Sequence, residues 1–457
     1  MSKRYDAIII GAGQAGPPLA GRLTKAGMTV AVIERKLFGG TCVNTGCMPT
    51  KALVASAFAA HLARRAADYG VLLSGGVSID MQAVNARKDA ITLRSRTGIR
   101  DWLRSMERCT VYEDHARFTG PHEIAVSGET ISAERIFINA GGRAIVPDMP
   151  GIDQVHYLTN TSVLQLDAVP RHLVIIGGSY IGLEFAQIYR RFGSDVTVVE
   201  KGPRLIARED EDASSAVKDI LEREGIAIRL HAECIRFARN GDKIEVGVDC
   251  TSGPPEISGS HALLAVGRRP NTDDLGLERA GIVTDAHGYI SVDDELRTSV
   301  PGVWAIGDCN GRGAFTHTSY NDFQIVAANL LDGGKRRVSD RIETYALYTD
   351  PPLGRAGLTE TAARASGRKV RVGMRPMTKV GRAIEKGETL GFMKIVVDAE
   401  SKAILGAAIF GVGGDEAIHG ILDTMSAGAP YTALEQTMHI HPTVSELIPT
   451  LLDELGP

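Results

Sequence analysis

The sequence lacks the long apolar runs and the charge excess that mark membrane and nucleic-acid-binding proteins. No hydrophobic run approaches the roughly 18 residues that a transmembrane helix requires. The N-terminal apolar segment ends in glycines rather than at the small-residue cleavage site of a signal peptide. Lysine and arginine number 51 against 55 aspartate and glutamate residues, and the net charge of −4 is spread without long runs. We therefore expect a soluble cytoplasmic protein that binds neither nucleic acid nor a membrane.

Cysteine is scarce, with 6 in 457 residues, which excludes a disulfide-dense secreted domain. Two of them, Cys42 and Cys47, lie close together. The other four are isolated, namely Cys109, Cys234, Cys250 and Cys309. A structural zinc site needs a second pair of cysteine or histidine ligands, so we expect no metal. One local pair in a reducing compartment indicates either redox chemistry or no function at all.

Glycine, by contrast, is abundant. The chain has 51 glycines, about 11% against a usual ~7%, so its backbone makes many tight turns or close approaches. With 44% hydrophobic and 23% charged residues, the composition excludes disordered and fibrous proteins. At roughly 150 residues per domain, the length predicts about three domains.

One plan of strand, glycine-rich turn, helix and strand occurs over residues 5–34 and again over 171–200. The first copy has strands at 5–10 and 29–33 and a helix to Lys25; its turn glycines and closing acid are Gly11, Gly13, Gly16 and Glu34. The second has strands at 173–176 and 195–199 and a helix to Arg191; its equivalents are Gly177, Gly178, Gly182 and Glu200. In both copies the last turn glycine precedes the acid by 18 residues. The repeat predicts two dinucleotide-binding sites.

The chemistry of such a site explains the residue types. Glycines let the backbone approach a pyrophosphate, the helix N-terminus donates N–H groups to it, and the acid accepts a hydrogen bond from a ribose hydroxyl. Glu200 pairs with a free 2′-hydroxyl and repels a 2′-phosphate, which favours NADH over NADPH. Lys201 and Arg204 lie close enough in the sequence to weaken that preference.

The cysteine pair directly follows the first repeat and precedes an alanine-rich stretch, 52–67, that we expect to be a helix. Five residues apart at a helix start, both thiols can bond to each other and both feel the positive end of the helix, which lowers thiol pKa. Lys51, one turn beyond Cys47, adds positive charge. The pattern therefore favours a reactive pair over two inert buried cysteines.

The C-terminal third has a different pattern of predicted elements. Strand-like runs at 391–397 and 404–410 are followed by helical stretches at 415–427 and 444–455, a sequence of elements typical of an α+β domain. Segment 330–342 is the expected boundary.

Several motifs together resemble those of the flavoprotein disulfide reductases, which include dihydrolipoamide dehydrogenase, glutathione reductase and mercuric reductase. Segment 39–51 is similar to the redox-active disulfide motif of that family. The others are similar to its two interdomain glycine turns, its second FAD motif and its C-terminal acid–base pair, and lie at 139–143, 265–272, 304–308 and 441–446. The resemblance covers essentially the whole chain.

The resemblance implies an α/β fold with two Rossmann-like dinucleotide-binding domains and a C-terminal α+β dimerisation domain. It implies a discontinuous FAD-binding domain at 1–150 and 271–335, an NAD(P)-binding domain at 151–270, and a dimerisation domain at 343–457. The FAD-binding residues it implies are Gly11, Gly13, Gly16, Glu34, Gly40, Thr41, Lys51, Ala116, Gly141 and Asp308. The NAD(P)-binding residues it implies are Gly177, Gly178, Tyr180, Ile181, Gly182, Glu200 and Gly267, with Tyr180 gating the nicotinamide pocket.

The resemblance also implies catalytic roles. Cys47 would lie against the flavin as the charge-transfer thiolate, and Cys42 would be the interchange thiol that meets the substrate. His441, oriented by Glu446, would reach Cys42 from the partner subunit of an obligate homodimer. Near flavin N5, a pair is expected between Lys51 and Glu184. We expect His439 and His317 to be structural.

Departures from the family pattern bear on the electron acceptor. No cysteine follows Cys309, which argues against a genuine mercuric reductase and against the high-molecular-weight thioredoxin reductases. Segment 315–322 replaces the Ala-His-Lys-Ala stretch usual in dihydrolipoamide dehydrogenases, and it is closer to mercuric-reductase-like proteins without the mercury cysteines. Some relatives of that type reduce reactive chlorine or hypothiocyanous species, or metal ions. We expect a disulfide or another thiol-reactive small molecule as acceptor, with dihydrolipoamide dehydrogenase activity as an alternative.

Two further alternatives come from other functional classes. An NADH oxidase or peroxidase would pass electrons to oxygen or peroxide, but such relatives use a single cysteine. A non-catalytic flavoprotein sensor would keep the nucleotide sites without need of the cysteine pair, His441 and Glu446.

Overall fold

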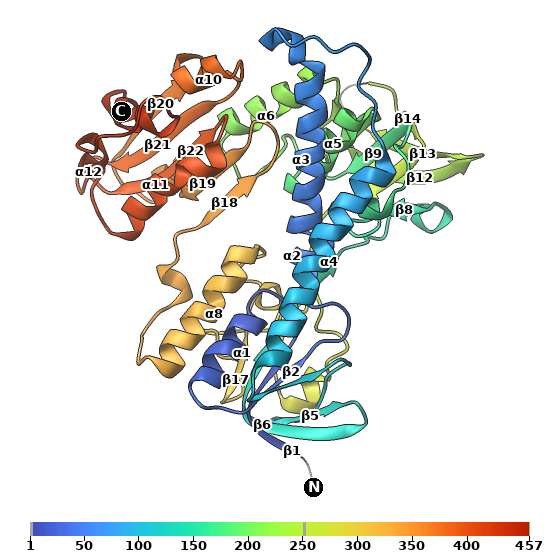
Figure 1. Ribbon diagram of the computed structural model, residues 1–457, viewed down its shortest axis with the longest axis vertical. Coiled ribbons are helices and arrows are strands. Elements are labelled where there is room, and N and C mark those ends of the chain that lie inside the picture. The colour runs from blue at the N-terminus through green and yellow to red at the C-terminus, as the bar shows by residue number, and fades with distance from the viewer. Residues whose placement is uncertain (1–2, 250–252, 457) are drawn as a thin grey trace.

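The computed structural model describes residues 3–249 and 253–456, apart from the side chain of Cys234. The isolated Cys250 of the sequence analysis lies outside the described residues. The architecture is mixed α/β, as predicted, with three larger sheets (Figure 1). No helix within the two described ranges is long and apolar enough to cross a membrane.

The first sheet contains the first copy of the repeat. Its order is β3-β2-β1-β6-β5-β4, and β17 pairs with β6. Parallel pairing joins β1 (Lys3–Ile10), β2 (Val30–Ile33), β3 (Cys109–Tyr112), β6 (Glu129–Ile138) and β17 (Val303–Ala305). An antiparallel extension is made by β4 (Arg117–Gly120) and β5 (Glu123–Val126). Because β17 follows the second sheet in sequence, the chain returns to this sheet, which fits a discontinuous domain.

The second sheet contains the second copy. It is parallel throughout, in the order β11-β10-β9-β15-β8. Its strands are β8 (Tyr157–Leu158), β9 (His172–Ile176), β10 (Asp195–Val199), β11 (Ala227–Arg229) and β15 (His261–Leu264). Beside it lies an antiparallel sheet of β12 (Glu233–Asn240), β13 (Lys243–Asp249) and β14 (Glu256–Gly259). A short antiparallel pair, β7 (Gly142–Ala144) with β16 (Arg268–Pro270), joins the two chain segments that connect the first sheet to the second.

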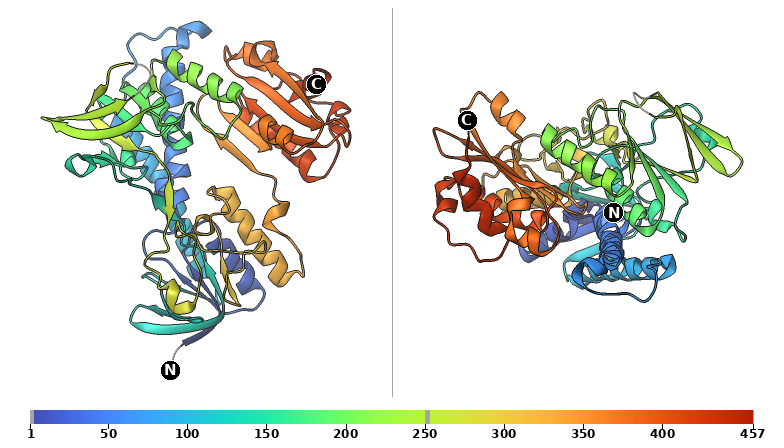
Figure 2. Two further views of the ribbon diagram at one scale, coloured as in Figure 1. Left: turned by 180° about the vertical axis from the view of Figure 1, so that it is seen from behind. Right: turned by 90° about the horizontal axis from the view of Figure 1, so that it is seen from above.

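The third sheet is antiparallel and forms the C-terminal region, in the order β18-β19-β22-β21-β20. Its strands are β18 (Thr344–Leu347), β19 (Leu353–Gly357), β20 (Val370–Pro376), β21 (Phe392–Asp398) and β22 (Ile404–Phe410). Both strands predicted from the sequence, β21 and β22, are present. Figure 2 shows this sheet beside the other two regions, with its own helices around it.

The helices connect and cover these sheets. Figure 1 shows α3 and α4 side by side along the long axis of the molecule, linking the region of β1 to that of β9. The helices of the nucleotide-binding regions are α1 (Gly16–Lys25), α2 (Gly40–Thr45), α3 (Cys47–Arg64), α4 (Met81–Ser105), α5 (Tyr180–Phe192), α6 (Glu211–Arg223), α7 (Leu277–Ala280) and α8 (Thr316–Leu331). Those of the C-terminal region are α9 (Glu360–Ala365), α10 (Gly381–Glu385), α11 (Gly414–Ser426), α12 (Thr432–Glu435) and α13 (Ile448–Asp453).

Two predicted helices have different bounds in the structure. The alanine-rich helix expected over 52–67 runs instead from Cys47 to Arg64, and a 3-10 turn follows at Ala66–Tyr69. Pro49 is compatible with the earlier start because it lies in the first turn, where a missing N–H costs no intrahelical bond. The helix expected over 444–455 is divided into a 3-10 turn at Ser445–Leu447 and the short helix α13, which again begins beside a proline, Pro449. The domain boundaries remain a prediction.

Candidate active site

A cavity of about 1940 Å³ lies where the first sheet, helices α2, α3 and α5, and strand β18 meet. This volume exceeds the ~300–1,000 Å³ of an ordinary small-ligand pocket. Its lining includes most of the FAD-binding residues expected from the sequence: Gly11, Gly13, Glu34, Gly40, Thr41, Lys51, Ala116, Gly141 and Asp308. Gly16 lies outside the lining. Both cysteines of the pair line the same cavity.

The first glycine turn is packed too tightly for any side chain. A Cβ on Gly11 would lie 2.2 Å from the carbonyl oxygen of Asn139, and one on Gly16 would lie 2.4 Å from the carbonyl oxygen of Gly11. Gly11 also has a φ of +105°, which side-chain-bearing residues rarely adopt. Gly40 approaches the same turn, since its Cβ would lie 3.0 Å from the Cα of Gly13. The turn is therefore a bare backbone cradle at the cavity wall.

The second turn repeats this geometry. A Cβ on Gly177 would lie 2.4 Å from the carbonyl oxygen of Ala265, and one on Gly182 would lie 2.1 Å from the carbonyl oxygen of Gly177. Of the NAD(P)-binding residues expected here, Tyr180 and Ile181 line the cavity. The remaining ones lie outside its lining, namely Gly177, Gly178, Gly182, Glu200 and Gly267.

The acids that close the two repeats hold the glycine turns directly. Glu34 accepts hydrogen bonds from the N–H groups of Ala12 (2.9 Å) and Lys36 (2.8 Å). Glu200 accepts from those of Gly178 (2.6 Å) and Gly202 (2.7 Å). Burial raises the pKa of Glu34 although these bonds oppose the shift. The sequence predicted a ribose-binding role for both acids and gave no sign of this backbone role.

The two cysteines are free thiols at the junction of two helices: Cys42 belongs to α2, and Cys47 is the first residue of α3. A hydrogen bond from Cys42, another from Thr316 and the charge of Lys51 lower the pKa of Cys47 to about 6, against the effect of burial. The shared hydrogen bond and burial raise the pKa of Cys42. The environment of the two thiols therefore favours the thiolate at Cys47, while the charge-transfer and interchange roles of the pair stay predictions.

Lys51 and Glu184 form the ion pair that the resemblance implies. The Lys51 Nζ lies 2.7 Å from a carboxylate oxygen of Glu184, whose side chain is 4% exposed. Glu184 also accepts a hydrogen bond from the backbone N–H of Tyr348 (3.1 Å), and Lys51 lies over the Tyr348 ring, 4.3 Å from its centroid. The pair therefore joins α3, α5 and the C-terminal region at the cavity.

Asp308 lies at the end of the second FAD motif, in a 3-10 turn that follows β17. Burial raises the pKa of its carboxyl, while Arg268, 3.3 Å away, opposes the shift. Gly307 beside it has a φ of +74°, and a Cβ there would lie 2.7 Å from Oγ of Ser319.

His441 and Glu446 form the expected pair, with 2.8 Å between Nδ1 and a carboxylate oxygen. The His441 side chain is 82% exposed and does not line the cavity, whereas both cysteines do. Within one chain the structure therefore does not bring His441 to Cys42. Arg382 holds the segment in place by donating to the carbonyl oxygen of Pro442 (2.5 Å).

The two histidines expected to be structural differ from each other. His439 is half-buried, and its Nδ1 lies 3.0 Å from the carbonyl oxygen of Thr437, two residues away. His317 lines the cavity, its Nε2 lies 2.7 Å from the carbonyl oxygen of Thr344, and burial lowers its pKa.

Sequence reasoning missed two features of the cavity. Thr316, at the start of α8, places its hydroxyl 3.3 Å from Sγ of Cys47. The rings of Tyr180, Phe315 and Tyr345 form one aromatic wall. Neither feature has a local sequence signature, because its members come from segments far apart in the chain.

Comparison with known proteins agrees with the family resemblance of the sequence motifs. The profile of the family described as "Pyridine nucleotide-disulphide oxidoreductase" matches residues 5–322, and that of its dimerisation domain matches residues 344–452. The chain is 35% identical to "Probable pyridine nucleotide-disulfide oxidoreductase RclA" of Escherichia coli, over 97% of both chains. It is 34% identical to a dihydrolipoyl dehydrogenase of Thermus scotoductus, over 97% of this chain and 96% of the relative. A mercuric reductase of Streptomyces lividans is 32% identical, over 97% of this chain and 94% of the relative.

Among solved structures, the chain is similar to "HOCl-induced flavoprotein disulfide reductase RclA from Escherichia coli". The TM-score is 0.89 at 35% identity, covering 98% of this chain and 99% of the other. A Cu(II) complex of the same protein matches with a TM-score of 0.90, over 99% of both chains.

Proposed function

The chain belongs to the pyridine nucleotide-disulphide oxidoreductase family, whose members are FAD-dependent enzymes driven by NAD(P)H, and we propose how its own residues carry the electrons. Electrons pass from the nicotinamide side of the cavity to Cys42 and Cys47, and from there to a disulfide or another thiol-reactive acceptor. The observation that carries this proposal is the placement of both thiols, on adjoining helices, in the cavity that the first glycine turn also lines.

The cavity fits FAD on structural grounds. Gly11, Gly13 and Gly40 leave a bare backbone surface at which a pyrophosphate can approach, and Asp308 of the second FAD motif supplies a half-buried carboxylate that lines the same cavity. When bound, FAD supplies the two-electron transfer between nicotinamide and disulfide.

The thiols then act in sequence. The Cys42 sulfur attacks an acceptor disulfide and forms a mixed disulfide, and the first product leaves as a thiolate that takes up a proton. The Cys47 thiolate attacks the Cys42 sulfur, which releases the second product and closes the Cys42–Cys47 disulfide. Because the pKa of Cys42 is raised, its attack needs a base to remove the thiol proton.

We assign that base to His441, oriented by Glu446. The imidazole is exposed on the dimerisation domain, beside the strongly exposed Met438 and Ile440, as a group placed to enter another subunit would be. In the proposed homodimer, the partner subunit's His441 completes each active site.

NADH is the proposed electron donor. The Glu200 carboxylate lies at the second glycine turn, fixed by two backbone N–H groups, where it repels the 2′-phosphate of NADPH. We place the protein in the cytoplasm, with no nucleic acid or membrane as partner.

The acceptor is proposed to be a small thiol-reactive molecule. Segment 315–322 differs from the stretch usual in dihydrolipoamide dehydrogenases, and a similar protein is described as an HOCl-induced disulfide reductase. Oxidised sulfur compounds formed under such stress are the favoured substrate class. The second candidate is dihydrolipoamide dehydrogenase activity, in which dihydrolipoamide donates its electrons to the Cys42–Cys47 disulfide, because relatives of that activity match along the whole chain.

NADH-driven reduction of a chromogenic aromatic disulfide tests the proposal. We expect Cys42→Ser and Cys47→Ser each to lower turnover about 100-fold or more, since either change breaks the thiol relay. Cys109→Ser is the matched control and is expected to leave turnover unchanged, because Cys109 lies in β3 outside the cavity lining. Retained turnover in either cysteine variant of the pair would contradict the proposal.

A further inference from the structure

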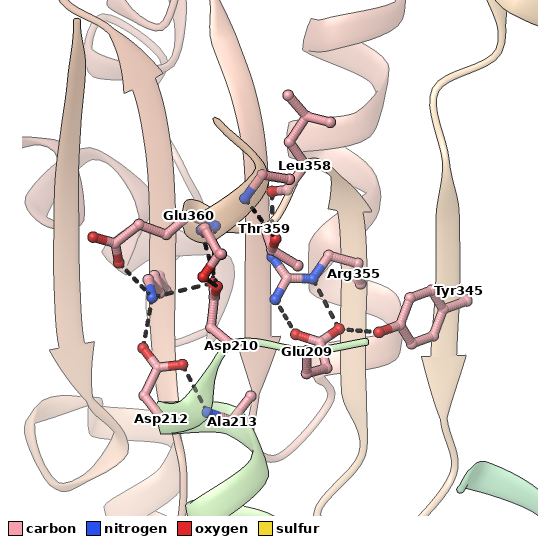
Figure 3. A network of polar contacts seen from close by, with 12 residues as sticks. Glu209, Asp210, Asp212, Ala213, Tyr345, Arg355, Leu358, Thr359 and Glu360 are labelled. Atoms are coloured by element: carbon pink, nitrogen blue, oxygen red, sulfur yellow. Dashed lines mark hydrogen bonds and ion pairs between the residues drawn. The ribbon is translucent and has the colours of Figure 1, made fainter. Parts of the chain in front are cut away.

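A cluster of buried charges joins the segment that follows the second repeat to the C-terminal sheet (Figure 3). Arg355 of β19 is 2% exposed, and its Nε lies 3.0 Å from one carboxylate oxygen of Glu209 while a terminal nitrogen contacts the other. The Tyr345 hydroxyl of β18 donates to the same carboxylate. Tyr345 and Arg355 are direct cross-strand partners, so two adjacent strands hold one buried acid.

Beside this carboxylate lies a second buried cation. Lys394 of β21 is 3% exposed, and its Nζ lies 3.3 Å from Asp210, 2.6 Å from Asp212 and 2.7 Å from Glu360. Buried charges are tolerated only when they are closely paired. The segment that leads from Glu200 into α6 is therefore held at one position on the C-terminal sheet.

Tyr345 links the buried charge cluster to the cavity through ring contacts. Its ring is parallel to that of Phe315, with 5.8 Å between centroids and 2° between planes. Phe315 in turn packs against Tyr180 at 5.3 Å and stacks on His317 at 5.3 Å. All four rings line the cavity, and Tyr180 is the residue expected to gate the nicotinamide.

We propose that Glu209, Arg355 and Tyr345 are positioning residues for the nicotinamide side of the active site. The buried carboxylate fixes the Tyr345 ring, and that ring holds Phe315 against Tyr180. Burial and the Glu209 charge raise the pKa of Tyr345, so the hydroxyl keeps its proton and donates at working pH. The inference rests on the proposed function, because it assigns the wall to hydride transfer from NADH.

Tyr345→Phe tests this directly, because it keeps the ring and removes the hydroxyl. Tyr189→Phe is the matched control: Tyr189 is buried on α5, the helix that begins with Tyr180, and its hydroxyl donates to the carbonyl oxygen of Val163 (2.7 Å). Three readouts are measured on the FAD-loaded protein. They are the limiting rate of flavin reduction by saturating NADH in anaerobic stopped flow, the rate of reoxidation by the aromatic disulfide, and hydrogen–deuterium exchange over 314–318.

We expect Tyr345→Phe to slow flavin reduction about tenfold, since a hydrogen bond to a buried charge is lost. Exchange over 314–318 should become faster, and reoxidation by the aromatic disulfide should keep its wild-type rate. Tyr189→Phe should change none of the three.

The inference is overturned if Tyr345→Phe reduces its flavin at the wild-type rate, or if both half-reactions slow alike. It is equally overturned if Tyr189→Phe gives the same changes, because the role would then be merely structural. If NADH fails to reduce the flavin of the wild-type protein, the proposed function fails. Hydrogen–deuterium exchange over 314–318 then still decides whether the Tyr345 hydroxyl stabilises the aromatic wall.

Discussion

Replacing Thr316 by valine tests how the protein keeps Cys47 ionised. The Thr316 hydroxyl lies 3.3 Å from the sulfur and is one of three groups that lower the pKa of Cys47 to about 6, after the hydrogen bond from Cys42 and before the charge of Lys51. Because the pKa is lowered in the folded protein, the thiolate exists above about pH 6 and is lost as the pH falls through that value. At pH 7, a group with this pKa is about 90% ionised.

The expected magnitude follows from the geometry. A hydrogen bond to a charged acceptor is worth about 1.5–3 kcal/mol, and a 3.3 Å contact to sulfur lies at the weak end. One pKa unit corresponds to about 1.4 kcal/mol. Thr316→Val should therefore raise the pKa of Cys47 by about one unit, so that only about half of it is ionised at pH 7.

The assay is a pH titration of the thiolate in the Cys42→Ser background, where the introduced hydroxyl still donates to Cys47 and no disulfide forms. Long-wavelength absorbance of the flavin-loaded protein reports the thiolate, and the rate of alkylation by iodoacetamide gives a second readout. Thr316→Ser, which keeps the hydroxyl, should titrate like its parent. An unchanged or lower pKa in Thr316→Val would refute this account of the thiolate.

Three further variants test other parts of the site. Lys51→Met leaves the Glu184 carboxylate with only a backbone partner, and we expect urea unfolding to show a loss of about 1–3 kcal/mol; an unchanged midpoint would mean that the pair adds no stability. His441→Gln should slow reoxidation by a disulfide about 100-fold or more in stopped flow while flavin reduction by NADH is unaffected, and His439→Gln should leave both rates alone. Glu200→Ala should raise kcat/KM for NADPH relative to NADH at least several-fold, and an unchanged ratio would remove this carboxylate as the source of selectivity.

The parts of the fold that the sequence predicts are those with local signatures. Gly11 and Gly177 occupy turns in which a side chain would collide with a backbone carbonyl oxygen, so only glycine fits there. The glycines and their spacing to Glu34 and Glu200 can therefore be recognised from the sequence alone. The cysteine pair can be recognised in the same way, because both thiols lie in one short segment, on neighbouring helices.

Long-range contacts escaped prediction for a physical reason. The buried acid Glu209 is the first of four consecutive carboxylates at the start of α6 in the sequence, and only the tertiary fold shows that Arg355 and Tyr345 surround it. Thr316 likewise reaches Cys47 across 269 positions of the chain. The role of His441 depends on a second subunit, which no reading of one chain can place.

An anaerobic titration of the FAD-loaded protein with NADH, followed by visible absorbance in wild type and Cys42→Ser, tests the central claim most directly. The claim is that electrons pass through the cysteine pair and leave Cys47 as a thiolate beside the flavin. It predicts a long-wavelength band at two electrons per subunit in the wild type, and the same band before any NADH is added in Cys42→Ser. Direct bleaching of the wild-type flavin without such a band would contradict it, and an oxidase or sensor function would take its place.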